Sequence, residues 1–254
     1  MKKIAAIVIA TASLLSFSAC ALAVGQEVSV TAAYGTPVVD GKLDNAYLKS
    51  GKIPVANFGN LANDGTEADV PTMATGEGYL LWDESNLYFF YAVKDPTPIV
   101  DSFESGSTDA VEMGFDFDNT NSDEARPVSY GDNGMFLKTA PYAKALGFPE
   151  GEALWVAGFS AWSDELKDGA PYKVATTVNA GGYTVEGKLI LNDAVKSMFK
   201  AGYSFGYAVS ILDDVNDNGA RDIKITWGRN DGDIQAINML NTSGSCDKVV
   251  LGAK

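Results

Sequence analysis

Short runs rich in Val, Ile, Tyr, Phe and Thr, separated by clusters of Gly, Asn, Asp and Pro, fill most of this chain. Residues 111–118 alternate strictly, with apolar side chains at every odd position from Val111 to Phe117 and polar residues or glycine between them. In a β-strand this alternation places all the apolar side chains on one face. Residues 87–93 are instead apolar at both kinds of position, which is typical of a central, doubly covered strand.

The same reading predicts further strands at residues 183–191, 205–212 and 223–227, and short helical turns at 44–50 and 193–200. Strands do not alternate with long helices, so a parallel α/β sheet is not expected. The pattern therefore predicts an all-β protein, an antiparallel β-sandwich.

The first 23 residues resemble a signal peptide. Lys2 and Lys3 precede an apolar stretch at 4–17, and Ala21 and Ala23 form a small-residue cleavage site. The sequence predicts cleavage after Ala23, a mature domain at 24–254, and export to the periplasm, the cell surface or the medium. Cys20 leaves open the alternative of a lipid anchor at that residue.

Composition excludes several kinds of partner and of chemistry. The 19 basic and 33 acidic residues give a net charge of −14, which disfavours nucleic acid, anionic membranes and anionic polysaccharides and leaves neutral ligands and divalent cations. Histidine is absent, which excludes Ser-His-Asp and Cys-His catalysis and His-ligated zinc or haem. If Cys20 is removed with the signal, Cys246 alone remains and no intrachain disulfide can form.

Five segments, in order, resemble a family-9 carbohydrate-binding module, a jelly-roll-type sandwich within the wider DOMON-like group. They are YGTPVVDGKLDNAY (34–47), WDESNLYFFYAVKD (82–95), TDAVEMGFD (108–116), GGYTVEGKLIL (181–191) and LDDVNDNGARDIKITW (212–227). The resemblance implies a β-sandwich that binds a polysaccharide or its chain end, carries structural calcium, and often accompanies enzymes that degrade xylan or cellulose.

The resemblance transfers only part of the family's binding site. The family glutamate corresponds to Glu112, the arginine falls near Leu137 with Lys138 as the nearest cation, and the glutamine falls near Ser210. The two tryptophans that clamp a sugar ring would fall at Gly106 and around 234–235, where this chain has no tryptophan. The family's stacking clamp is therefore not visible in the sequence.

Sugar rings pack their C–H faces on aromatic side chains, so a glycan site needs exposed aromatic residues. Phe103, Trp155 and Trp162 lie in irregular, polar surroundings and are the candidates, together with Glu112 and Lys138. Trp82 and Trp227 flank predicted strands and are expected in the core.

A hairpin at 214–222 resembles the first half of a calcium loop, because oxygen-bearing side chains recur at alternate positions before Gly219. The predicted ligands are Asp214, Asn216, Asn218 and Asp222. The bidentate glutamate of an EF-hand is missing, since position twelve is Ile225. A turn rich in Asp and Asn for conformational reasons is the alternative.

Together these features predict an exported, non-catalytic carbohydrate-binding protein for plant-type polysaccharide, of the xylan or cellulose class, that supports carbohydrate catabolism beside a partner glycoside hydrolase. Three alternatives stay open. Glu112 and Glu186 could form the carboxylate pair of a glycosidase. Met113, or Met135 with Lys138, could ligate haem in a DOMON-like domain. The sandwich could also have lost its sugar site and serve protein interaction.

Overall fold

The computed structural model describes residues 28–61, 65–97, 109–119, 134–139, 155–158, 172–179, 181–216, 221–228 and 246–254. The strands are β1 (Ser29–Tyr34), β2 (Ile53–Val55), β3 (Asn57–Leu61), β4 (Thr75–Trp82), β5 (Asn86–Lys94), β6 (Ala110–Asp116), β7 (Gly134–Thr139), β8 (Trp155–Gly158), β9 (Tyr172–Asn179), β10 (Gly182–Ile190), β11 (Ser204–Asp213), β12 (Ile223–Thr226) and β13 (Asp247–Leu251). The short helices are η1 (Tyr47–Lys49), η2 (Val70–Thr72) and α2 (Asp193–Met198).

All five predicted strands are present, with ends that move by a residue or two. The predicted strand at 111–118 is β6, which ends at Asp116 because the chain then turns and Asn119 adopts a left-handed conformation with φ of 54°. The helical turn predicted at 193–200 is α2. Its N-cap is Asn192, whose side chain accepts a hydrogen bond from the Val195 N–H.

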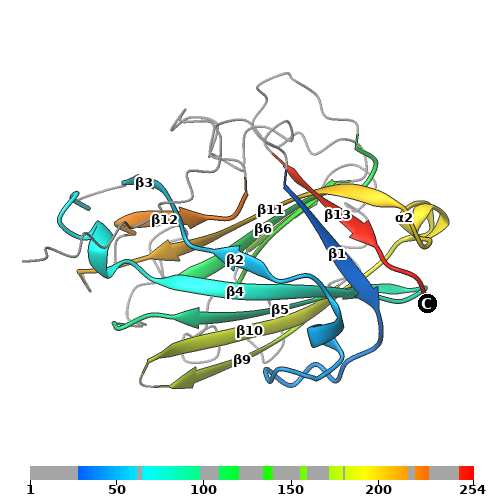
Figure 1. Ribbon diagram of the computed structural model, residues 1–254, viewed down its shortest axis with the longest axis horizontal. Coiled ribbons are helices and arrows are strands. Elements are labelled where there is room, and N and C mark those ends of the chain that lie inside the picture. The colour runs from blue at the N-terminus through cyan, green and yellow to red at the C-terminus, as the bar shows by residue number, and fades with distance from the viewer. Residues whose placement is uncertain are drawn as a thin grey trace, which may run out of the picture.

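The strands form two layers (Figure 1). Sheet A has the order β8-β7-β6-β11, with β13 and β12 pairing successive parts of β11, and β3 pairing β12. Sheet B has the order β1-β4-β5-β10-β9, with β2 also on β4. These pairings are antiparallel apart from those of β1, which confirms the predicted sandwich.

Strand β1 joins the two layers. Residues Ser29–Ala32 pair in parallel with β13 of sheet A, and Ala33 and Tyr34 pair in parallel with β4 of sheet B. The sequence reading did not predict these two parallel pairings, because they join segments far apart in the chain.

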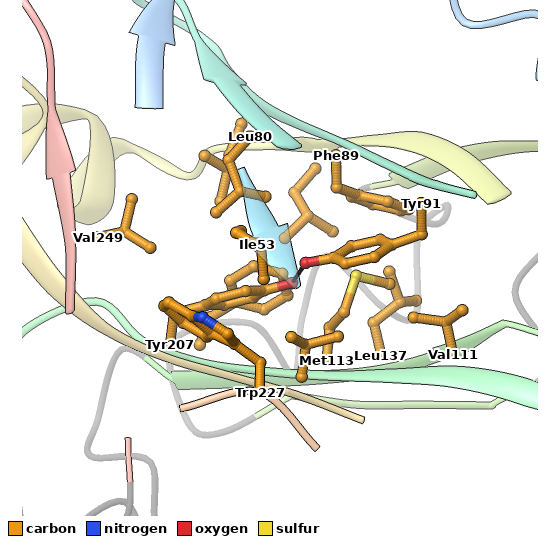
Figure 2. Packing of buried hydrophobic residues seen from close by; sticks show 14 of the residues in the cluster. Ile53, Leu80, Phe89, Tyr91, Val111, Met113, Leu137, Tyr207, Trp227 and Val249 are labelled. Atoms are coloured by element: carbon orange, nitrogen blue, oxygen red, sulfur yellow. Dashed lines mark hydrogen bonds between the residues drawn. The ribbon is translucent and has the colours of Figure 1, made fainter. Parts of the chain in front are cut away.

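The core lies between the sheets, where the apolar faces of the alternating strands meet. Trp82 is fully buried there and Trp227 nearly so, as predicted. Tyr91 of sheet B and Tyr207 of sheet A meet in this layer, with their hydroxyl oxygens 2.5 Å apart (Figure 2). One buried hydroxyl therefore donates a hydrogen bond and the other accepts it, and the contact crosses from one sheet to the other.

Residues 35–50, here called the strap, cross the outer face of sheet B. Beneath them lies a second, smaller apolar cluster. Its buried members are Tyr47, Tyr79, Leu81, Tyr88 and Phe90. Within the part of the chain that the structure describes, no helix is long and apolar enough to cross a membrane.

The Tyr91–Tyr207 contact predicts how the free energy of unfolding changes when one or both tyrosines are replaced by phenylalanine. We expect Tyr91→Phe to lower the free energy of unfolding by about 1–3 kcal/mol, because it leaves the Tyr207 hydroxyl buried without its partner. The double variant Tyr91→Phe/Tyr207→Phe is expected to recover most of this loss, since it removes both polar groups. Urea unfolding of the wild type, the two single variants Tyr91→Phe and Tyr207→Phe and the double variant measures the coupling; losses that simply add would contradict it.

Candidate functional site

The register of sheet A brings several predicted site residues into one row. Lys138 of β7 pairs with Trp155 of β8 on one side and with Glu112 of β6 on the other. Glu112 in turn pairs with Ser210 of β11, and Ser210 pairs with Thr226 of β12. This row runs across sheet A, and three of its members were predicted from the sequence alone as ligand-binding residues.

Glu112 points away from the core yet is only 4% exposed. Its Oε2 lies 3.0 Å from the Lys224 Nζ and accepts a hydrogen bond of 3.2 Å from the Ser210 hydroxyl. Lys224 is also only 4% exposed. A buried carboxylate is costly without a partner, and this lysine supplies the opposite charge.

The sequence reading missed Lys224, although a signal for it exists. In β12 the side chains of Ile223 and Ile225 enter the core, so Lys224 and Thr226 must lie on the opposite face. The antiparallel pairing of β12 with β11, which brings Lys224 next to Glu112, cannot be deduced from the sequence.

Of the other predicted ligand-binding residues, two lie in described strands and two lie outside the described residues. The backbones of Lys138 and Trp155 are part of β7 and β8. Phe103 and Trp162 lie outside the described residues. Leu137, where the family arginine would fall, is fully buried in the core, so Lys138 is the cation-bearing position that faces Glu112 in the register.

Glu112 and Glu186 lie on opposite sides of the molecule. Glu112 is on the outer face of sheet A, and Glu186 of β10 is on the outer face of sheet B beneath the strap. The core lies between the sheets. A glycosidase needs its two carboxylates across one cleft, so these two do not form such a pair. Met113, considered above as a haem ligand, is fully buried in the core.

A cluster of buried carboxylates lies at one end of the sandwich. Asp95 follows β5, Asp109 precedes β6, and Asp213 ends β11. One carboxylate oxygen from each lies within 4.8 Å of those from the other two, and all three residues are buried. The cluster thus joins sheet B, through Asp95, to sheet A, through Asp109 and Asp213.

Hydrogen bonds satisfy only part of this cluster. Asp95 Oδ1 accepts from the Thr97 N–H at 2.8 Å, and Asp213 Oδ2 accepts from the Ala74 N–H at 2.5 Å. Among the described residues, the buried Asp95 Oδ2 has no hydrogen-bond partner. Burial, together with the neighbouring negative charges, raises the pKa of Asp213 to about 7, because both disfavour the charged carboxylate, and the hydrogen bond from the Ala74 N–H only partly opposes them.

Oxygen ligands of this kind suit Ca²⁺, which prefers carboxylates and carbonyls. The predicted calcium hairpin lies against the same cluster: Asp214 donates its N–H to Asp109 Oδ1 at 2.8 Å, and the Asp222 N–H donates to the Asp213 carbonyl at 2.9 Å. Asp222 Oδ2 also accepts from the backbone and side-chain N–H groups of Asn216, each at 3.0 Å. Asn218 lies outside the described residues.

A separate hollow of about 330 Å³ opens on the outer face of sheet B. Its described lining residues are Ala56, Thr75, Gly76, Glu77, Ala92 and Lys94. None of them is aromatic and none belongs to the row across sheet A, so the hollow is distinct from the predicted site.

Comparisons with known proteins identify relatives of this chain. Endo-1,4-beta-xylanase A of Thermotoga neapolitana is 28% identical over 199 residues, which are 78% of this chain and 16% of the xylanase. Endo-1,4-beta-xylanase C of Paenibacillus barcinonensis is 28% identical over 196 residues, which are 76% of this chain and 15% of that enzyme. The chain thus spans about a sixth of the length of these relatives.

A solved structure supports the fold. The family-9 carbohydrate binding module of Caldicellulosiruptor kristjanssonii in complex with cellotriose superposes with a TM-score of 0.59 at 17% identity, covering 89% of this chain and 95% of the module. The sequence also matches the profile of the carbohydrate family 9 binding domain-like family over residues 39–236. The chain therefore belongs to the family-9 carbohydrate-binding modules.

Proposed function

We propose that this protein binds a plant-type polysaccharide of the xylan or cellulose class, or its chain ends, at the row across sheet A. The observation that most supports this proposal is the set of contacts that Glu112 makes with Lys224 and Ser210. Lys224 and Ser210 both engage Oε2, so they hold the carboxylate in one orientation. A carboxylate held in this way can accept hydrogen bonds from the vicinal hydroxyls of a sugar, and charge-assisted bonds of this kind are the strong ones.

The rest of the row supplies the other chemistry that a glycan needs. Trp155 occupies a register position two strands from Glu112, about 10 Å at the usual strand spacing. We infer that a sugar ring packs at Trp155 while the hydroxyls of a neighbouring unit reach Glu112, with Lys138 between them. Phe103 and Trp162 remain proposed contacts from the flanking segments.

The relatives suggest the biological setting. They are xylanases of which a module like this is a small part, and the superposed module binds cellotriose. We propose that the protein is exported, with or without a lipid anchor at Cys20, and supports a glycoside hydrolase in polysaccharide breakdown without catalysis of its own.

Glycan binding is tested by Glu112→Gln, which keeps the shape of the side chain and removes its charge. We expect retention on xylan or cellulose to weaken at least tenfold, since hydrogen bonds to a charged group contribute about 1.5–3 kcal/mol. The matched control is Glu67→Gln, because Glu67 is an exposed carboxylate. Affinity electrophoresis and pull-down on insoluble glycans measure the effect, and circular dichroism checks the fold.

Two outcomes would count against the proposal in different ways. Unchanged binding by Glu112→Gln would show that the glycan lies elsewhere. No retention of the folded wild-type protein on any glycan would indicate that the sandwich serves protein interaction instead.

We also propose that Asp95, Asp109 and Asp213 hold a structural Ca²⁺, with the hairpin residues Asp214, Asn216, Asn218 and Asp222 beside them. The buried Asp95 Oδ2 without a hydrogen-bond partner supports this, because an unpaired buried carboxylate oxygen is costly. A cation there would tie the two sheets together at this end of the sandwich.

Calcium is expected to raise the thermal midpoint, by an amount equivalent to about 2.7 kcal/mol when free calcium is 100 times its Kd. Asp95→Asn should abolish the increment, whereas Glu67→Gln should keep it. Asn218→Ala distinguishes the ligands: a full increment would place the ion at the three buried aspartates, and a lost one would place it in the hairpin. Equal midpoints of the wild-type protein in calcium and in chelator would contradict the site.

A further inference from the structure

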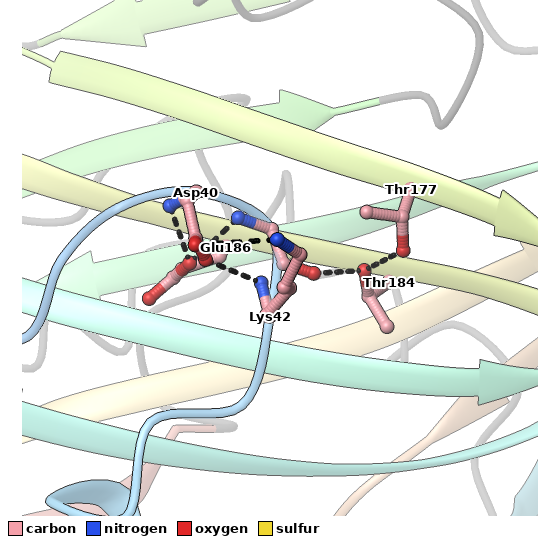
Figure 3. Close-up of polar contacts among 6 residues, drawn as sticks. Asp40, Lys42, Thr177, Thr184 and Glu186 are labelled. Atoms are coloured by element: carbon pink, nitrogen blue, oxygen red, sulfur yellow. Dashed lines mark hydrogen bonds and ion pairs between the residues drawn. The ribbon is translucent and has the colours of Figure 1, made fainter.

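Glu186 of β10 fastens the strap to sheet B (Figure 3). Its Oε2 accepts hydrogen bonds from two consecutive backbone N–H groups of the strap, those of Asp40 at 2.9 Å and Gly41 at 2.8 Å. Gly41 has φ of 81°, the left-handed conformation that lets successive N–H groups converge on one anion. Glu186 itself is fully buried.

A second set of contacts holds the same turn in place. The Thr184 hydroxyl donates to the Gly41 carbonyl at 2.6 Å, and the Thr177 hydroxyl lies 2.6 Å from that of Thr184 (Figure 3). A Cβ on Gly41 would lie 3.0 Å from the Thr177 methyl group. The strap is thus fitted closely to β9 and β10, with glycine at the point of closest approach.

The other oxygen of Glu186, Oε1, is buried. Within the described part of the chain no group donates a hydrogen bond to it, although the Tyr47 hydroxyl lies beside the carboxylate. Tyr47 donates its own proton to the Phe89 carbonyl at 3.2 Å. While Tyr47 donates to Phe89, its hydroxyl oxygen can only accept from Glu186, so a proton on Oε1 would complete a chain from Glu186 through Tyr47 to Phe89.

No cation neutralises Glu186 among the residues that the structure describes. The strap brings Asp40, Lys42, Asp44 and Tyr47 to this side of the sheet, and the neighbouring strands bring Tyr79, Tyr88, Lys173 and Lys188. Lys42 pairs with Asp40, 3.7 Å away, and its side chain is exposed. None of these lysines forms an ion pair with Glu186, so among the described residues the carboxylate is surrounded by the two backbone N–H groups and the Tyr47 hydroxyl.

We propose that the strap is a proton-linked latch, in which Glu186 takes up a proton as the strap closes and, as the neutral acid, donates a hydrogen bond to Tyr47. Oε2 keeps both backbone contacts in either state, since it stays an acceptor. Closing covers Tyr79, Tyr88 and Phe90 on the face opposite Glu112. The latch does not depend on the ligand proposed for sheet A.

The direction of the pH dependence follows from the surroundings of Glu186. Burial raises the pKa of this carboxyl above its ordinary value of 4.5 and the charge on Asp40 adds to the rise, whereas the two backbone N–H groups and a hydrogen bond with the Tyr47 hydroxyl oppose part of it. A group whose pKa is higher in the closed state stabilises that state fully below its open-state pKa. This stabilisation is lost as the pH rises through the closed-state pKa, so the strap is held more tightly in acid.

The test is amide hydrogen exchange of Asp40 and Gly41 in the full protein, corrected for the intrinsic pH dependence of exchange. In the wild type we expect constant protection in acid, a fall of up to tenfold per pH unit above about 4.5, and a plateau above the closed-state pKa. Glu186→Gln, whose amide can donate to Tyr47 at every pH, is expected to keep the acid-state protection throughout. Hydrogen exchange of the backbone amides that pair β5 with β10 serves as the control, because it reports any change in the global stability of the protein.

Wild-type protection that is flat or rises with pH would overturn the latch, as would an unaltered pH dependence in Glu186→Gln. If that variant does not fold, an NMR titration of the Glu186 carboxyl ¹³C in the wild-type protein tests the proposal instead. A midpoint above the ordinary glutamate range supports the latch, and one at or below it refutes the proposal.

Discussion

The contact between the apolar inner faces of the two sheets determines where every other group of this protein can lie. Strands alternate, so the residues between the core side chains must project from the outer faces. Glu112 and Glu186 therefore emerge on opposite sides of the sandwich, each from a strand whose other face is buried. The same contact brings the Tyr91 and Tyr207 hydroxyls together between the sheets, where they can only satisfy one another.

The buried carboxylates of the molecule meet the cost of desolvation in different ways. Glu112 has a lysine and a hydroxyl. Glu186 has two backbone N–H groups and a tyrosine beside it. The aspartates at the end of the sandwich lie with their carboxylate oxygens close to one another, an arrangement that a divalent cation would stabilise. The local partners thus fit the role proposed for each carboxylate: ligand contact, fastening of the strap, or metal binding.

The comparisons establish the family of this protein but not the details of the row across sheet A. The profile match and the superposition establish the family and its fold. They do not supply the tryptophans of the family clamp, which this sequence lacks at Gly106 and around 234–235. The retained glutamate, with Lys224 and Ser210 around it, is the part of the family site on which the proposed sugar site rests.

Five of the described strands, the sandwich class and the outward direction of Glu112 could be predicted from the sequence, because they follow from a local period of two residues. It also identified Trp155 and Lys138, which the register then placed in the row with Glu112. The ion pair of Lys224 with Glu112, and the meeting of Asp95 with aspartates from two distant segments, could be found only in the folded molecule. Those contacts depend on strand register and sheet stacking, which act between residues far apart in the chain and leave no periodic signal in it.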